Sequence, residues 1–412
     1  MGRSLLSRRR LLRGALGAAG STMLTGAARA ESPPPRPSAP DEPNKVPGQH
    51  PRELGERSPF EHPQRRVRHR RLSGESESPL QDLRGMITPA DLHYERHHAG
   101  IASIDPDRYQ LLVHGMVERP TMFSLADLQR FPSRSRICFL ECSGNGNAAY
   151  RDIVPELSPQ QIDGLTSTSE WTGVPLATLF REVGIKPGAT WFLAESYDSA
   201  AYARSIPMSK AWDDAMIVYS QNGEALRPEQ GYPARLLLPG FEGSTQVKWI
   251  RRIEVADQPF MTREETSKYT DPLADCTARL FSLEMDAKSL ILFPAYPAVL
   301  PAKGPFEVRG LAWSGRGLIT KVEVSADGGR QWQPAELQQP VLPKCHTAFR
   351  YPWNWTGGEA LLMSRATDET GYVQPTLREL RRARGPGTFY HFNHIRAWRV
   401  ARDGRVVFGL EG

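Results

Sequence analysis

The chain has 412 residues, with 52 lysines and arginines against 46 aspartates and glutamates, 35 glycines and 35 prolines. This length and balance are typical of a soluble protein of two or three domains. The formal charge of +6 belongs to the first thirty residues, which hold six arginines and no acid, so residues 31–412 are neutral overall and have no electrostatic reason to bind nucleic acid. Four cysteines without a Cys-x-x-Cys-His motif exclude a disulfide scaffold, a zinc cluster and an attached c-type haem.

The first thirty residues are typical of a twin-arginine export signal. Arg8, Arg9 and Arg10 precede a weakly apolar stretch, and Ala28-Arg29-Ala30 is a small-x-small cleavage site. The apolar stretch is about 15 residues long, whereas a membrane-spanning helix needs about 20, and no later segment is long enough to span. Because this route carries folded proteins, chiefly those that receive a cofactor in the cytoplasm, the signal predicts a periplasmic protein with a complex prosthetic group.

Residues 31–85 are crowded with Pro, Arg, Ser, Glu and His and show almost no apolar periodicity. We predict a disordered or surface-hugging extension here, with order beginning near Met86. The basic cluster Arg65–Arg71 is either a solvated charge run or a contact for an acidic partner.

Residues 86–281 alternate short apolar strands with brief helices, which predicts a mixed α+β domain. Ser124 is placed to cap a helix over residues 125–130, and Asn222-Gly223 is a strong hairpin signal. A strand over residues 136–141 runs directly into Cys142. The other expected elements are a helix over residues 175–183 and strands over residues 109–116, 191–196, 216–220, 234–238 and 247–255.

Residues 282–412 change to a pattern of strands without helices. Strands are expected over residues 306–313, 319–325, 360–367 and 396–402. This spacing predicts an immunoglobulin-like β-sandwich. Such modules usually serve assembly rather than chemistry, so the site is sought in the domain before it.

Cys142 is the first candidate for chemistry. It ends an apolar strand and is followed by Ser143-Gly144-Asn145-Gly146-Asn147, a loop with free backbone N–H groups and room for a bulky ligand. A lone cysteine is by default buried and inert, but a soft thiolate favours a soft or high-valent metal. Together with the export signal, the loop predicts that Cys142 is the protein ligand of a cofactor metal.

The motif Leu140–Asn145 resembles the Cys-Ala-Gly-Asn element of the sulfite oxidase family, whose cysteine binds molybdenum. Further motifs resemble that family in its own order, namely Tyr94–His98, Ala201–Pro207, Asn222-Gly223, Gly231–Arg235, Pro239-Gly240, Val247–Trp249, Ala312–Gly315, Ser325–Gly329 and Gly371–Pro375. The resemblance covers residues 86–400. It implies an α+β molybdopterin domain over residues 86–281 and an immunoglobulin-like dimerisation domain over residues 282–412.

Carried over residue by residue, the resemblance implies molybdenum with molybdopterin as the cofactor and Cys142 as the metal ligand. The residues implied to hold the pterin and its phosphate are Tyr94, Arg96, His97, His98, Asp198, Arg235, Gln246, Val247 and Lys248. Arginine and lysine suit this task because they bind phosphate oxygens directly. Gln230 replaces a family histidine. The implied catalytic residues are Cys142, Arg96, Tyr269 and His391, although the residues alone also allow a surface tyrosine at 269 and a core histidine at 391.

Within the family, His93–Ile101 and Thr388–Asn393 resemble the sulfane dehydrogenase branch more than the animal oxidases. Gly146 and Asn147 stand where the animal enzymes have two arginines of an anion pocket, and His391 stands where they have another. The resemblance implies oxygen-atom transfer to a sulfane sulfur on a carrier-protein cysteine. Because this chain has no haem motif, electrons would pass to a separate c-type cytochrome subunit, in a homodimer or a hetero-tetramer.

Two alternatives stay open. One is a sulfite dehydrogenase that acts on free sulfite with a cytochrome c acceptor, and the other is a non-catalytic secreted binding protein, which would contain no molybdenum. Among the remaining cysteines, Cys138 is expected to be buried packing, whereas Cys276 and Cys345 have the option of pairing in an oxidising compartment.

Overall fold

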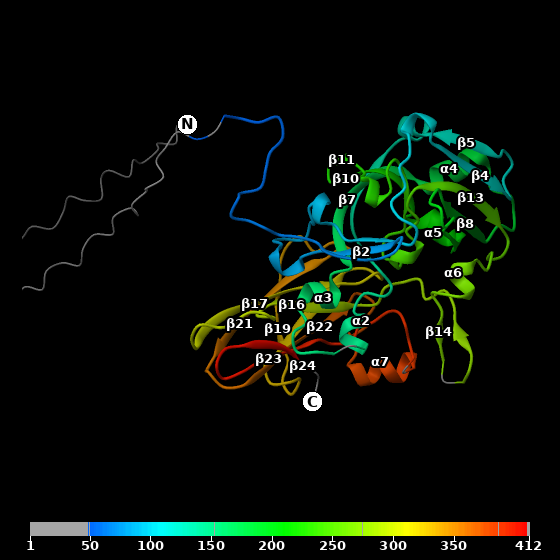
Figure 1. Cartoon of the computed structure of the whole chain (residues 1–412). Coiled ribbons are helices and arrows are strands. Elements are labelled where there is room, and N and C mark those ends of the chain that lie inside the picture. The colour runs from blue at the N-terminus through cyan, green and yellow to red at the C-terminus, as the bar shows by residue number, and fades with distance from the viewer. Residues whose placement is uncertain (1–47, 49, 152, 274, 386, 410–412) are drawn as a thin grey trace, which may run out of the picture. The chain divides into compact units, whose positions relative to one another are not determined.

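The computed structural model describes residues 48, 50–151, 153–273, 275–385 and 387–409. The chain divides into two compact units, Met1–Ser58 and Pro59–Gly412. The first unit has no helix or strand among its described residues, and the predicted export signal lies outside the described residues. All elements below belong to the second unit (Figure 1).

The first domain of this unit contains three sheets, with strand orders β1-β2-β3, β11-β10-β7-β6 with β12 against β10, and β5-β4-β13-β8-β9. Strand β13 is parallel to β4 and antiparallel to β8, so the third sheet is mixed. The strands are β1 (Arg66–Arg70), β2 (Ser73–Glu77), β3 (Glu95–His97), β4 (Gln110–Gly115), β5 (Thr121–Ser124), β6 (Arg134–Glu141), β7 (Thr166–Pro175), β8 (Trp191–Ser196), β9 (Ala203–Pro207), β10 (Met216–Gln221), β11 (Glu224–Ala225), β12 (Arg235–Leu237) and β13 (Ile250–Ala256).

The second domain is a sandwich of two sheets, with strand orders β16-β17-β21-β20 and β19-β18-β22-β23-β24, and a two-stranded ribbon, β14-β15, precedes it. The strands are β14 (Asp271–Pro272), β15 (Ala278–Arg279), β16 (Lys288–Phe293), β17 (Gly304–Trp313), β18 (Ile319–Ser325), β19 (Gln333–Pro334), β20 (Glu336–Leu337), β21 (Thr347–Trp355), β22 (Ala360–Asp368), β23 (Ala397–Val400) and β24 (Val406–Gly409).

Helices in both domains are short. They are α1 (Leu125–Arg130), α2 (Asn147–Arg151), α3 (Pro159–Asp163), α4 (Leu176–Val183), α5 (Met208–Asp213), α6 (Arg263–Thr266) and α7 (Leu377–Arg384), with 3-10 turns at Leu80–Asp82, Ala90–Leu92, Pro106–Arg108, Pro228–Gln230 and Gly243–Thr245. Within the described part of the chain, no helix has the length and apolar character needed to cross a bilayer.

Local sequence signals account for several of these elements. Ser124 caps α1, because its hydroxyl accepts from the Asp127 N–H while the Asp127 carboxylate accepts from the Ser124 N–H. Asn222 and Gly223 both have positive φ, +51° and +81°, as the tight turn between β10 and β11 requires. The expected α+β domain followed by a β-sandwich is confirmed.

Three expectations need correction. Residues 66–85 are not a disordered extension, because β1 and β2 form a hairpin that pairs with β3 and Leu80 is buried in the core. The second domain is not free of helices, since Thr376 provides a capping box for α7 at an arginine-rich segment that the strand pattern did not reveal. Cys276 and Cys345 do not pair, because both are free and only Cys345 is buried.

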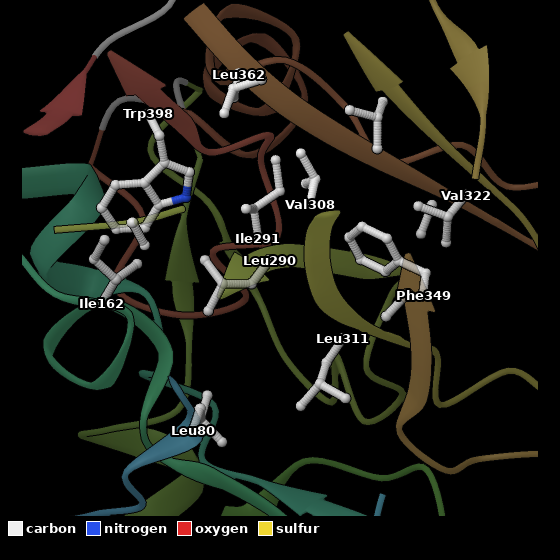
Figure 2. Packing of buried hydrophobic residues seen from close by; sticks show 14 of the residues in the cluster. Leu80, Ile162, Leu290, Ile291, Val308, Leu311, Val322, Phe349, Leu362 and Trp398 are labelled. Atoms are coloured by element: carbon white, nitrogen blue, oxygen red, sulfur yellow. The ribbon is translucent and has the colours of Figure 1, made fainter. Parts of the chain in front are cut away.

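The hydrophobic core is continuous across the border of the two domains. Trp313, Phe349 and Trp398 of the sandwich belong to the same buried cluster as Leu80 and Ile162 of the first domain. Figure 2 shows Ile162 between Trp398 and Leu80, with the sandwich residue Leu290 nearby. Burying this apolar surface holds the domains in one arrangement.

A buried charge network crosses the same border. Lys288, at the start of β16, places its Nζ 2.6 Å from Glu141 Oε1 and 3.1 Å from Asp163 Oδ1, and Arg396 Nε lies 3.1 Å from Asp163 Oδ2. All four side chains are at most 1% exposed. Burial raises the pKa of Asp163, but the charges of Arg396 and Lys288 outweigh burial and hold that pKa below its ordinary value. Each buried charge is therefore paired, as burial demands.

Replacing Lys288 by Met should destabilise the protein by about 3–5 kcal/mol, because Glu141 would lose its buried cation and Asp163 would keep only Arg396. Urea unfolding followed by tryptophan fluorescence measures the change. The matched control is Lys321→Met on β18, whose ammonium is half exposed beside Glu323 and should be worth at most about 1 kcal/mol. Equal losses for the two variants would contradict the role given to the network.

Candidate active site

A pocket that is partly open to solvent lies in the first domain. The predicted site residues that line it are Tyr94, Arg96, His97, His98, Cys142, Asp198, Arg235, Gln246, Val247, Lys248 and Tyr269, and Gln230, which was assigned no role, lines it as well. They come from β3, the loop after β6, the loop between β8 and β9, the segment 230–248 and the loop after α6. Segments far apart in the sequence thus form one site.

Cys142 lies immediately after β6, in a loop held by backbone hydrogen bonds. Its N–H donates to Leu165 O at 3.0 Å, and its carbonyl accepts from the Asn145 N–H at 2.9 Å. Burial raises the pKa of the Cys142 thiol to about 11, although the Arg96 charge and the Gly144 N–H act in the opposite direction. A thiol with this pKa stays protonated near neutral pH until a metal replaces its proton. Gly243 packs against the same loop, so closely that a Cβ there would lie 3.0 Å from Cys142 Cα.

Arg235 and Lys248 are two of the three cations that line the pocket in the described chain, the third being Arg96. Arg235 donates to the carbonyls of Gln230 and Gln246, both at 3.0 Å, and Lys248 donates to that of Glu229 at 2.8 Å. Among the residues that the structure describes, no carboxylate lies within ion-pair distance of either cation, and Arg235 Nε is buried without a partner. Burial, and then the Arg235 charge, lower the pKa of Lys248 to about 7. The charges of Glu95, Asp198 and Glu229 act in the opposite direction on Lys248 but do not offset these two effects. Two neighbouring cations without an ion pair indicate a binding site for an anion.

An aromatic group forms another part of the pocket. His98 Nε2 lies 3.1 Å from the Tyr269 hydroxyl, and the His98 ring stacks on Tyr202 with centroids 5.4 Å apart. Burial raises the pKa of Tyr269 well above its ordinary value and lowers that of His98 to about 3. Near neutral pH both groups are uncharged, so the Tyr269 hydroxyl keeps its proton for donation.

Backbone strain also occurs at the pocket. Trp249 and Tyr269 have φ values of +52° and +26°, in the region that bulky residues avoid. Trp249 is held there by a hydrogen bond from its indole N–H to Pro228 O at 2.9 Å. Such conformations persist only where the surroundings enforce them.

His391 does not line the pocket. It is 2% exposed, and its Nε2 lies 3.1 Å from Glu242 Oε2. The Glu242 carboxylate also pairs with Arg204 at 3.1 Å. His391 therefore belongs to a buried polar group outside the pocket lining, but its backbone N–H donates to the carbonyl of Ser143, next to Cys142, at 2.8 Å, and its catalytic role stays a prediction.

Gly146 and Asn147 also lie outside the pocket lining. Gly146 has φ +94°, and a Cβ there would lie 2.4 Å from an Arg396 guanidinium nitrogen. Asn147 is exposed at the start of α2. Neither these two positions nor His391 lines the cavity, and the interpretation of the three as the remnant of an anion pocket stays a prediction from the resemblance.

Sequence reasoning missed several pocket residues. His93, Glu95, Tyr202, Ser244 and Trp249 all line the cavity. His93, Glu95, Tyr202 and Trp249 lie inside motifs used for the resemblance. The available signal was the position of His93, Glu95 and Trp249 next to Tyr94, Arg96 and Lys248, and for Tyr202 its place in the motif Ala201–Pro207. Ser244 had no such signal, because only the 3-10 turn Gly243–Thr245 brings it to the site.

Two family models match the chain. The oxidoreductase molybdopterin binding domain matches residues 98–264, and the Mo-co oxidoreductase dimerisation domain matches residues 279–397. Curated relatives include NADH nitrate reductase 2 from Phaseolus vulgaris, 33% identical over 69% of this chain, and NADH nitrate reductase from Solanum lycopersicum, 33% identical over 74% of this chain. The chain spans only 36% and 38% of the length of these relatives.

A solved structure is more similar over its full length. The chain is 42% identical to the sulfane dehydrogenase SoxCD from Paracoccus pantotrophus, with a TM-score of 0.81, over 86% of this chain and 95% of that chain. Both domains and their order agree with the matched family models. The chain therefore belongs to the sulfite oxidase family of molybdopterin enzymes.

Proposed function

We propose that this protein is a periplasmic molybdenum oxidoreductase that oxidises a sulfane sulfur carried on the cysteine of a carrier protein. Electrons pass one at a time to a c-type cytochrome subunit. The observation that carries the proposal is the meeting, in one pocket, of the Cys142 thiol with the cations Arg235 and Lys248, neither of which has an ion pair in the described chain. The likeness to a sulfane dehydrogenase supports the choice of sulfur as the atom oxidised.

The pocket fits molybdenum with molybdopterin. Cys142 offers one soft ligand, and Arg235 and Lys248 offer charge and N–H donors for a phosphate. Gln246, Val247, Asp198, Tyr94, His97 and His98 complete the wall that would hold the pterin. When bound, the cofactor supplies oxygen-atom transfer and the two-electron redox change, while the protein supplies position and charge.

Arg96 and Tyr269 are the residues left to act on the substrate. With Arg235 and Lys248 assigned to the phosphate, Arg96 is the remaining arginine or lysine of the pocket lining in the described chain. Its guanidinium is suited to orient an anionic or polar sulfur group. The Tyr269 hydroxyl, beside His98, holds a proton that it can donate in a hydrogen bond to a developing oxyanion.

A pocket in which Arg96 is the one arginine left for the substrate favours a sulfane tethered to a carrier protein over free sulfite. A small dianion depends on several charge-assisted hydrogen bonds, and each one missing costs about 1.5–3 kcal/mol. A carrier protein spreads its recognition over a surface and raises the local concentration of sulfur at the site. The dimerisation domain fits either a homodimer core or a hetero-tetramer with the cytochrome.

Cys142→Ser should abolish turnover but retain pterin, because the phosphate contacts remain while a hydroxyl replaces the soft ligand. Cys138→Ser is the matched control on the same strand. Cys138 is buried outside the pocket lining, so this variant should keep most activity. Molybdenum and pterin content, together with cytochrome reduction, test both. Activity lost in Cys138→Ser and kept in Cys142→Ser would reverse the assignment, and wild-type protein without molybdenum from a cofactor-competent host would favour a binding protein.

Sulfate binding to cofactor-free protein should weaken as the pH rises through about 7, because the buried Lys248 ammonium loses its proton there. Sulfate itself does not titrate in this range. Calorimetry at pH 6 and pH 8 should give a weaker affinity at the higher pH, and Lys248→Met should remove most of that difference. A wild-type affinity that is constant between the two pH values would contradict the anion site.

With its cytochrome partner, the enzyme should show a specificity constant for carrier-bound sulfane at least about tenfold above that for free sulfite, as the loss of one charge-assisted contact implies. Steady-state reduction of the cytochrome with each substrate measures the ratio. A ratio of one or below would assign the protein as a sulfite dehydrogenase instead.

A further inference from the structure

The hairpin β1–β2 builds one wall of the pocket. Within the described residues, strand β3 pairs with β2 alone, in the register Gly74 with His97, Glu75 with Arg96 and Ser76 with Glu95. All three residues of β3 line the pocket. Figure 1 shows the hairpin in blue at β2. The matched molybdopterin-binding domain begins only at residue 98, so this wall precedes it in the chain.

The hairpin holds the Arg96 guanidinium at several points. Arg96 Nη1 donates to Ser73 Oγ at 3.0 Å and to Gly74 O at 3.4 Å. Arg96 Nε lies 3.7 Å from Glu75 Oε2. An arginine with these contacts loses most of its rotamer freedom before any substrate arrives.

Glu75 occupies the centre of a row of alternating charges. It is the cross-strand partner of Arg68 on one side and of Arg96 on the other, and its Oε1 lies 3.3 Å from Arg68 Nε. The Glu75 and Arg96 side chains are 23% and 29% exposed, so the pair contributes little to stability. Its effect is geometric, because opposite charges directly across two strands hold each other in one orientation.

Gly74 leaves room for the His97 ring against the hairpin. A Cβ at this position would lie 2.6 Å from the Nε2 atom of the His97 ring. The missing side chain lets the His97 imidazole pack on the hairpin backbone, next to Arg96 on the same strand. The hairpin residues therefore complement the neighbouring pocket residues by shape as well as by charge.

We propose that Ser73 and Glu75 are positioning residues, which fix Arg96 so that its remaining N–H groups face an anionic sulfur substrate. The inference rests on the proposed function, since it names what prepares Arg96 for that substrate. A guanidinium that is already oriented loses less entropy on binding, and a misplaced one weakens binding even when the charge is kept.

The test uses full-length, cofactor-loaded protein with the double change Ser73→Ala and Glu75→Gln. The Kd for sulfate, measured by calorimetry, and the KM for sulfite should each rise about tenfold, as expected for losing one or two contacts that orient a charged donor. The value of kcat should change far less, and pterin content per chain should stay at the wild-type level. Ser73→Thr, which keeps the hydroxyl, should retain the wild-type sulfate affinity.

His69→Ala is the matched control, because His69 is exposed on the same hairpin and pairs across it with Gly74. The inference is overturned if the double variant keeps the wild-type sulfate Kd, or if His69→Ala weakens sulfate binding as strongly. It is also overturned if Arg96→Met leaves sulfate binding unchanged. Sulfate binding needs no turnover, so wild-type protein that binds sulfate through Arg96 but oxidises no sulfur compound would refute the proposed function and leave the positioning role intact.

Discussion

The buried network of Glu141, Lys288, Asp163 and Arg396 is the constraint on which the site depends. Glu141 is the residue directly before Cys142, and Asn145, in the same loop, donates to Glu141 Oε1 at 3.0 Å. The indole N–H of Trp313, from the sandwich, donates to Glu141 Oε2 at 2.7 Å. The loop that carries the thiol is therefore anchored by side chains of the second domain. An assembly module thus takes part in placing the candidate metal ligand, although it contributes no residue to the pocket lining.

Ion pairing differs between the charge network at the domain border and the pocket. In the network every cation faces a carboxylate, which compensates the cost of removing the charges from water. In the pocket, Arg235 and Lys248 donate to carbonyl groups and have no carboxylate of the described chain within ion-pair distance, although Glu95 and Asp198 act on Lys248 from farther away. Charges are thus paired at short distance where they stabilise the fold, and have no ion pair at Arg235 and Lys248, where an anion is proposed to bind. This contrast identifies the site without reference to any relative.

The two sides of the pocket are built in different ways. One side comes from the loops and strands of the matched molybdopterin-binding domain, and the other from β3, which is held by an N-terminal hairpin. Glu75 and Ser73 act on Arg96 across that sheet. The N-terminal segment, although polar and arginine-rich, is therefore part of the architecture of the pocket.

The sequence by itself determined the two-domain organisation, the capped helix after Ser124, the Asn222-Gly223 turn and eleven of the residues that line the pocket, because local backbone preferences and short motifs carry this information. Only the tertiary structure placed residues 66–77 in a sheet, since a hairpin of charged residues has no apolar periodicity and is stabilised by its pairing with β3. Only the structure moved His391 and Gly146 out of the pocket, because their neighbours Glu242 and Arg396 are distant in sequence. Side-chain direction and ion pairing across domains depend on such long-range contacts, which a linear pattern does not contain.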